Sequence, residues 1–201
     1  MPSESTTEAP AQGWVSAIRG TNLLASLAAL REEGLSESYW NQLPTAHHQE
    51  MRAILASDWV SIDLAHLHYG VLDELVQDKD QQRRLGFVSA GISRGAVVRT
   101  IARGLKVTAR VASLDPVRLG LRRVSWLWSR FAQGGQCIAV QEEDGRAVLT
   151  IEGLGIGVYP YVRHSFTGSI AASLSEFHRG EVTVHCLPGF TKAKLEFVVC
   201  W

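Results

Sequence analysis

The spacing of hydrophobic residues in this chain of 201 residues changes at Gly134-Gly135. Before that point apolar residues recur every three or four positions, which is the period of an amphipathic helix. After it apolar and polar residues alternate in short runs, which is the period of a strand with one buried face. The sequence therefore predicts an α+β fold in which a helical N-terminal lobe precedes a small antiparallel sheet.

Capping and breaking residues divide the first half into helices. Residues 20–33 run through Leu23, Leu27 and Leu30 and end before Gly34, as is typical of a helix with glycine after its last turn. Asp115-Pro116 combines a capping side chain with a proline suited to the first helical turn. Further helices are expected over 36–43, from 45 to 55, from 58 or 61 to 75, over 87–113 and over 117–131.

The C-terminal third predicts two hairpins with a helix between them. Residues 137–153 form two alternating runs about Asp144-Gly145, a dipeptide that favours a tight hairpin turn. Residues 163–178 have helical spacing and many small residues, and residues 181–187 and 193–201 form the second hairpin. Hairpin–helix–hairpin predicts a four-stranded antiparallel sheet that carries one helix.

Length and composition indicate one domain. The chain is 46% hydrophobic, enough for one core. Residues 1–13 are rich in Ser, Thr and Glu and are expected to be a disordered arm. The domain would then span 14–201, with a helical lobe at 14–133 and an α+β lobe at 134–201. No stretch approaches the roughly 20 apolar residues of a membrane span, and three cysteines without metal-ligand spacing favour the cytoplasm.

The net charge is zero, but the charges are unevenly distributed. Residues 1–80 hold 4 Lys/Arg and 12 Asp/Glu, whereas residues 81–130 hold 11 Lys/Arg and one acidic residue, Asp115. Such a basic block either attracts an anionic partner or pairs with the acidic third of the same chain, and the sequence leaves both open. The residues expected to bind an anion or a partner are Arg99, Arg103, Lys106, Arg110, Arg118 and Arg122.

Catalytic, metal and nucleic-acid motifs lack the pattern that their chemistry needs. His66 and His68 are two positions apart on a helix, so their rings point to different faces. Ser93 lies between Gly91 and Gly95 like a nucleophile elbow, but inside a helical region instead of a strand-to-helix turn. The basic block lacks interleaved aromatic residues and a helix-turn-helix pattern. We expect no enzyme activity, no metal site and no sequence-specific nucleic acid.

The last 38 residues carry a pattern that resembles a known fold. A helix containing Gly168 leads into a strand, Cys186, a turn at Gly189 and a final strand with Glu196 and Phe197. This order resembles the haem nitric-oxide/oxygen-binding (H-NOX) domains and the related 4-vinyl-reductase-type ligand-binding domains. The chain also resembles a myxobacterial paralogous family of unassigned function whose last strand ends in Trp, as here at Trp201.

The resemblance implies a ligand-binding sensor, but the residues that hold haem in H-NOX domains are absent. Those domains carry an axial His on a helix before a Tyr-x-Ser-x-Arg motif that clamps the haem propionates. Here no His lies between His68 and His164, and Tyr161-Val162-Arg163 is too short for the motif. The second Cys of the 4-vinyl-reductase-type domains is also missing, near Ala193–Lys194.

We therefore expect a non-catalytic, haem-free sensor or interaction domain in bacterial signalling, without a cofactor. It would bind a small apolar or anionic ligand between its lobes, or a regulatory protein partner, and a homodimer is compatible with it. The alternative is a scaffold that docks on an acidic partner through its basic helical face. A deep apolar cavity between the lobes would favour the ligand-binding hypothesis, and a packed interior would favour the scaffold.

Overall fold

The computed structural model describes residues 13–93, 104, 115–143, 145–178, 180–189, 191 and 194–201. The first elements are β1 (Ala17–Arg19), α1 (Gly20–Glu32), α2 (Ser36–Gln42), a short 3-10 turn (Thr45–His47), α3 (His48–Ala53), β2 (Trp59–Ser61), α4 (Ile62–Leu75) and α5 (Lys79–Ser93). The later elements are α7 (Pro116–Leu121), α8 (Val124–Phe131), β3 (Ala132–Gln133), β4 (Gln136–Glu143), β5 (Arg146–Glu152), a 3-10 turn (Gly155–Val158), α9 (Pro160–Ser175), β6 (Thr183–Cys186) and β7 (Lys194–Cys200).

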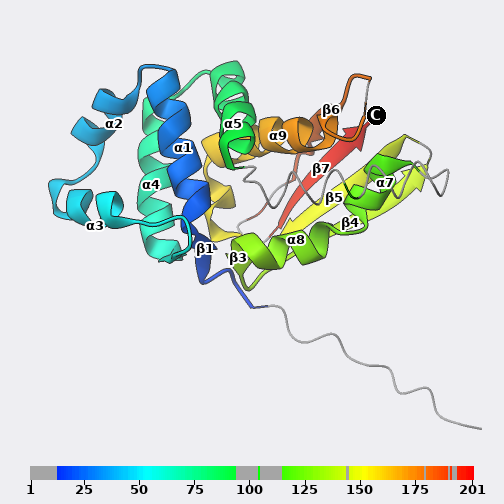
Figure 1. Ribbon diagram of the computed structural model, residues 1–201, viewed down its shortest axis with the longest axis horizontal. Coiled ribbons are helices and arrows are strands. Elements are labelled where there is room, and N and C mark those ends of the chain that lie inside the picture. Colours follow the sequence, from blue (N-terminus) through cyan, green and yellow to red (C-terminus); the bar gives the residue numbers. More distant parts are fainter. Residues whose placement is uncertain are drawn as a thin grey trace, which may run out of the picture.

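The predicted α+β class is confirmed. Strands β4, β5, β7 and β6 pair in that order into an antiparallel sheet of two hairpins, and α9 lies between the hairpins in the sequence. Gly145 in the first hairpin turn has a φ of 76°, a conformation that glycine adopts without strain. Helices α1 to α4 gather on one side of the molecule and the four-stranded sheet lies on the other (Figure 1).

A second sheet of three strands, in the order β2-β1-β3, escapes the sequence analysis. Its central strand β1 is three residues long, too short to show an alternating pattern. Ile18 pairs with Val60 of β2 on one side and with Ala132 of β3 on the other. The sheet therefore joins the start of the helical lobe to its end, at the boundary with the α+β lobe.

Two predicted helices have wrong bounds. Helix α5 begins at Lys79 instead of residue 87, because the Asp78 carboxylate accepts a hydrogen bond from the Gln81 N–H (2.7 Å) at its start. The helix predicted over 117–131 is two helices, α7 and α8. They are separated at Arg122-Arg123, where the Arg123 N–H turns to the Gly120 carbonyl (3.0 Å).

One face of the four-stranded sheet forms the floor of the core. Alternate residues of β5 and β7 point inward and are almost fully buried. On this face the ring of Phe166 from α9 stacks on Phe197, with ring centroids 6.3 Å apart. The inward-facing residues are Ala147, Leu149, Ile151, Leu195, Phe197 and Val199.

Helices α5 and α9 cross with their backbones in contact at two glycines. A Cβ atom on Gly168 would overlap the carbonyl oxygen of Arg83, and one on Gly86 would overlap the carbonyl oxygen of Ser165. At the same crossing the Ser169 hydroxyl donates to the Gly86 carbonyl (2.9 Å). Because α5 also packs on α1 of the helical lobe and α9 packs on β6 and β7 of the sheet, this crossing joins the two lobes.

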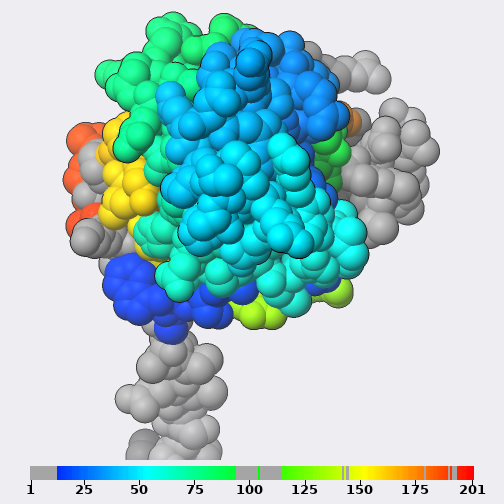
Figure 2. All heavy atoms as spheres, turned by 90° about the vertical axis from the view of Figure 1, so that its left-hand side faces the viewer, coloured from blue at the N-terminus to red at the C-terminus, as the bar shows by residue number. Residues whose placement is uncertain are grey.

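Helices α1 to α4 cover one end of the molecule. Seen from that end, their side chains form a continuous surface in front of the sheet (Figure 2). None of the described helices has the length and hydropathy needed to cross a membrane.

Replacing Gly168 by alanine tests the close crossing. Gly168→Ala must push α9 away from the Arg83 carbonyl, and overpacking of this kind lowers the free energy of unfolding by about 1 to 3 kcal/mol. Urea unfolding measures the change. Ser175→Ala, at an exposed position of the same helix, is the control and should change stability by less than about 0.5 kcal/mol. Equal stabilities of Gly168→Ala and the control would contradict the crossing.

Candidate functional site

A cavity of about 610 Å³ lies between the helical lobe and the sheet. Helices α1, α4 and α5 form one wall, α7 and α8 a second, and α9 with strands β4 and β5 a third. Ligand sites in proteins typically span about 300 to 1,000 Å³ and are mostly apolar. Large apolar side chains that line this cavity include Leu127, Phe131, Leu149, Ile151, Phe166 and Ile170. Its size and lining are those of a small-molecule site.

The described wall of the cavity is almost free of charge. Ser165, Ser169 and Ser173 lie four residues apart along α9 and all line the cavity. The hydroxyl of each donates to a backbone carbonyl, as in the 3.1 Å bond from Ser165 to Val162. Among the described lining residues the charged ones are Arg123 and Glu176, both exposed. The interior that the structure describes is therefore neutral.

Three buried polar side chains form a hydrogen-bonded chain behind the cavity wall. The Tyr39 hydroxyl of α2 lies 2.7 Å from Nδ1 of His68 on α4, and Nε2 of His68 lies 3.1 Å from the hydroxyl of Ser26 on α1. Ser26 also lines the cavity, whereas Tyr39 and His68 are completely buried. Burial lowers the pKa of His68 to about 3 and raises that of Tyr39. The three hydrogen-bonded side chains are therefore uncharged at physiological pH.

Ser26 and His68 have the separation of a nucleophile and its base, but not the acidity. A general base works best when its pKa lies near the working pH. With its pKa lowered to about 3, His68 has little tendency to take the Ser26 proton. The third group, Tyr39, is a neutral phenol where a hydrolytic triad has a carboxylate. The arrangement favours a fixed hydrogen-bond network over a nucleophilic centre.

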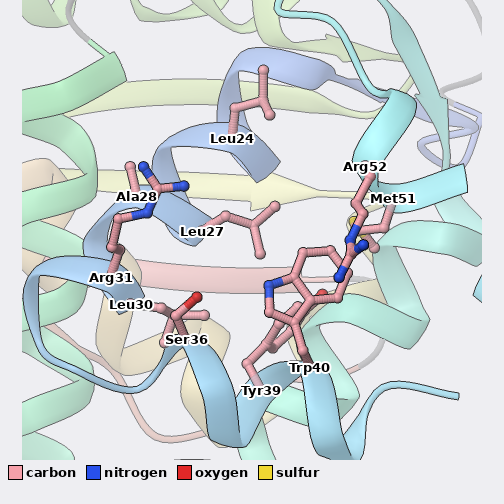
Figure 3. Close-up of a pocket in the computed structure, with 10 residues that line it drawn as sticks. All are labelled: Leu24, Leu27, Ala28, Leu30, Arg31, Ser36, Tyr39, Trp40, Met51 and Arg52. Carbon is pink, nitrogen blue, oxygen red and sulfur yellow. The ribbon is translucent and has the colours of Figure 1, made fainter. Parts of the chain in front are cut away.

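A smaller pocket of about 320 Å³ lies among α1, α2 and α3 (Figure 3). Leu24 and Leu27 line it from α1, and the guanidinium carbon of Arg52 lies 4.8 Å from the centre of the Trp40 ring. Different residues of α1 line the two spaces, because Ser26 faces the cavity between the lobes. This pocket lies within the helical lobe and is not between the lobes.

No His lines the cavity, although an axial His is the haem ligand that the resemblance implies. Every His, Cys and Tyr of the chain lies among the described residues, and the ones that line the cavity are Tyr69, Cys137 and Tyr161. Iron is held by a neutral imidazole, a thioether, a thiolate or a phenolate. Burial raises the pKa values of the Cys137 thiol and the Tyr69 phenol to about 12, and that of Tyr161 as well. Without a bound metal all three are therefore protonated at neutral pH, so iron could bind one of them only by displacing its proton.

The other haem contact expected from the resemblance is an Arg at the propionates. Arg163 is buried within α9, where its Nη2 donates to the Val158 carbonyl (3.2 Å), and it does not line the cavity. Arg123 lines it from the turn between α7 and α8. Neither belongs to a Tyr-x-Ser-x-Arg sequence.

The predicted anion-binding residues are only partly covered by the structure. Four of them, Arg99, Arg103, Lys106 and Arg110, lie outside the described residues. Arg118 and Arg122 lie on or next to α7, where Arg118 is half-buried and Arg122 is exposed. Neither of the two lines the cavity, so the anion-binding role of the block stays a prediction. In the part of the chain that is described, no three His, Cys, Asp or Glu side chains gather as a metal site would require.

Sequence reasoning missed the buried network. It treated His66 and His68 as a failed metal pair, and the two rings do diverge: His66 lies against Tyr159 (Nδ1 to hydroxyl, 3.4 Å) while His68 points inward. The sequence carried one signal of this, because His68 is four residues from both Leu64 and Leu72 on the buried face of α4. A polar residue at such a position needs a buried partner.

Comparison with known proteins identifies the fold. No family model and no curated protein matches the chain. The Fe(II) unliganded H-NOX protein from K. algicida superposes with a TM-score of 0.64 at 8% identity, over 91% of this chain and 96% of the other. An oxygen-binding H-NOX domain related to soluble guanylate cyclases gives 0.60 at 14% identity, over 91% and 94%. The chain has the H-NOX fold over nearly its whole length.

The buried His68 predicts a characteristic pH dependence of stability. Its pKa is about 3 in the folded protein and about 6.5 in the unfolded chain, so between these values the unfolded chain holds the extra proton. The contribution of His68 to the free energy of unfolding is complete above pH 6.5. It is lost as the pH falls towards 3, at up to about 1.4 kcal/mol per pH unit. Urea unfolding between these pH values measures the slope.

The matched variants are His68→Gln and His185→Gln, the second at an exposed position. His68→Gln should reduce the slope by up to the amount that one bound proton contributes, about 1.4 kcal/mol per pH unit. His185→Gln should leave the slope unchanged. If both variants kept the slope of the original chain, another group would be responsible for it.

Proposed function

We propose that this protein is a haem-free sensor domain that binds a small, mostly apolar ligand in the cavity between its lobes. The observation that carries the proposal is the cavity itself, about 610 Å³ lined by side chains from both lobes. A ligand held there contacts helices and sheet together, so its binding energy depends on how the lobes are placed. That dependence is what couples ligand binding to a change of shape.

The ligand chemistry of the cavity supports the haem-free part of the proposal. The neighbours with this fold are described as an Fe(II) protein and an oxygen-binding domain. In this chain the possible iron ligands of the lining are two protonated phenols and one protonated thiol. Residues 69–163, where the resemblance places the axial ligand, contain no His.

The absence of catalysis is also part of the proposal. It is supported by the low pKa of His68, which weakens the base of the Ser–His pair that the structure brings to the cavity wall. It is further supported by Ser93, which lies in the last turn of α5 and donates its hydroxyl to the Ala90 carbonyl (3.2 Å). A nucleophile elbow is a strand-to-helix turn, whereas Ser93 lies within a helix.

Other expectations from the sequence stay predictions. They are the resemblance to 4-vinyl-reductase-type domains and to the myxobacterial family, a bacterial signalling context, a cytoplasmic location, a regulatory protein partner and a homodimer. The scaffold hypothesis rests on the basic block, four of whose six residues lie outside the described part of the chain.

A neutral fluorescent probe tests ligand binding. N-phenylnaphthylamine should bind the full chain with a rise in fluorescence, because the described cavity wall is apolar and nearly uncharged. Ile170→Trp puts a larger side chain into the cavity from α9 and should weaken binding at least tenfold. Ser175→Trp, which adds the same side chain to an exposed position of α9, should bind as the original chain does. Equal binding by the two variants would remove the cavity as the site.

Haem binding is tested separately by absorption spectroscopy. The purified full chain should show no Soret band, and titration with haemin should give no saturable Soret shift. No His lines the cavity, and its buried thiol and phenols would each have to lose a proton to bind iron. A stoichiometric Soret band that Ile170→Trp abolishes would overturn the haem-free assignment.

A further inference from the structure

Three hydroxyl groups from three different helices meet on one side of the cavity. Ser26 belongs to α1, Tyr69 to α4 and Tyr161 to α9, and each lines the cavity. The rings of Tyr69 and Tyr161 have centroids 6.3 Å apart. Burial raises the pKa of the Tyr161 phenol, and the nearby Ser26 hydroxyl opposes this rise. The rest of the lining is mostly apolar, so this cluster gives the cavity a polar end.

The buried network behind this cluster has a definite hydrogen-bond direction. Tyr39 is completely buried and its hydroxyl contacts Nδ1 of His68 at 2.7 Å. A buried O–H needs an acceptor, so Tyr39 donates to Nδ1. A neutral imidazole that accepts at Nδ1 carries its proton on Nε2, and this N–H donates to the Ser26 oxygen (3.1 Å).

The same direction continues to the cavity. Since the Ser26 oxygen accepts from His68, its own proton is available for the Tyr161 oxygen. The Tyr161 hydroxyl can then donate its own proton to an acceptor in the cavity. Tyr69 has no hydrogen-bond partner among the described residues, and it too lines the cavity. The polar end therefore presents donors, and a donor in an apolar space is stabilised by an acceptor on whatever fills it.

No charged side chain among the described lining residues belongs to the hydroxyl cluster. A carboxylate buried without a cation loses its hydration and gains too little in return. The described lining residues offer one cation, Arg123, which is exposed in the turn after α7 and outside the hydroxyl cluster. A carbonyl or hydroxyl oxygen accepts from two phenols without that cost.

We propose, building on the ligand-binding function above, that the ligand is an apolar molecule with one uncharged oxygen acceptor. Tyr69 and Tyr161 donate to this oxygen, and Ser26, held by His68 and Tyr39, orients Tyr161. The apolar body lies against the side chains of α8, α9 and β5. The ligand class is thus a ketone, aldehyde, ester or alcohol of largely hydrocarbon character.

Two probes of the same shape test the inference. Benzophenone and diphenylmethane differ in a carbonyl against a methylene group, and each is titrated against N-phenylnaphthylamine bound to the full chain. Tyr69→Phe should weaken benzophenone about five- to tenfold and leave diphenylmethane unchanged, because only benzophenone loses a hydrogen bond. Tyr161→Phe should act in the same direction. Tyr159→Phe, outside the cavity lining, should change neither.

The outcomes separate the two proposals. Selective weakening of benzophenone by both cavity variants supports the inference. Displacement by both compounds with equal effects of each variant on the two would overturn the polar end and leave the ligand site standing. If neither compound displaced the probe and the probe itself did not bind, the ligand-binding function would fall. Circular dichroism confirms that Tyr69→Phe is folded, as expected for a hydroxyl without a described partner.

Discussion

The crossing of α5 and α9 at Gly86 and Gly168 is the contact on which the rest of the structure depends. Each glycine lies against a backbone carbonyl of the other helix, at Ser165 and Arg83, so no side chain separates the two helices. The close approach at this one point contrasts with the open space beside it, where α5 and α9 both line the cavity. The close crossing therefore joins the two lobes while the cavity beside it stays open.

The buried network serves a different purpose from the hydrophobic core around it. Tyr39, His68 and Ser26 come from three helices of one lobe and are satisfied by one another. Such a network is costly when it is incomplete and rigid when it is complete. Because its last member reaches the cavity wall, the network fixes the position of a hydroxyl group that faces the cavity. The low pKa of His68 keeps the network uncharged throughout the physiological pH range.

Periodicity and turn chemistry gave the fold class but not the cavity. The hairpin about Asp144-Gly145, the cap at Asp115 and the helix after Ser61 were readable, since each depends on residues close in sequence. The start of α5 was missed because residues 79–86 are mostly polar and lack an apolar stripe. A cavity depends on which side chains do not meet, and no local pattern records that. The contact of Ser26 with His68, 42 residues apart, is equally invisible to spacing.

The three-residue strand β1 has a consequence for how the chain reaches its structure. Ile18 pairs with Val60 on one side and with Ala132 on the other. The second of these partners is synthesised more than 110 residues after Ile18. During synthesis the N-terminal segment can pair with β2 early, but the sheet stays open on one side until Gln133 has left the ribosome. Contacts of such long range are closed late and slow the final step of folding. Truncations that stop before β3 should therefore yield a helical lobe with an unpaired strand edge, the kind of surface that promotes aggregation.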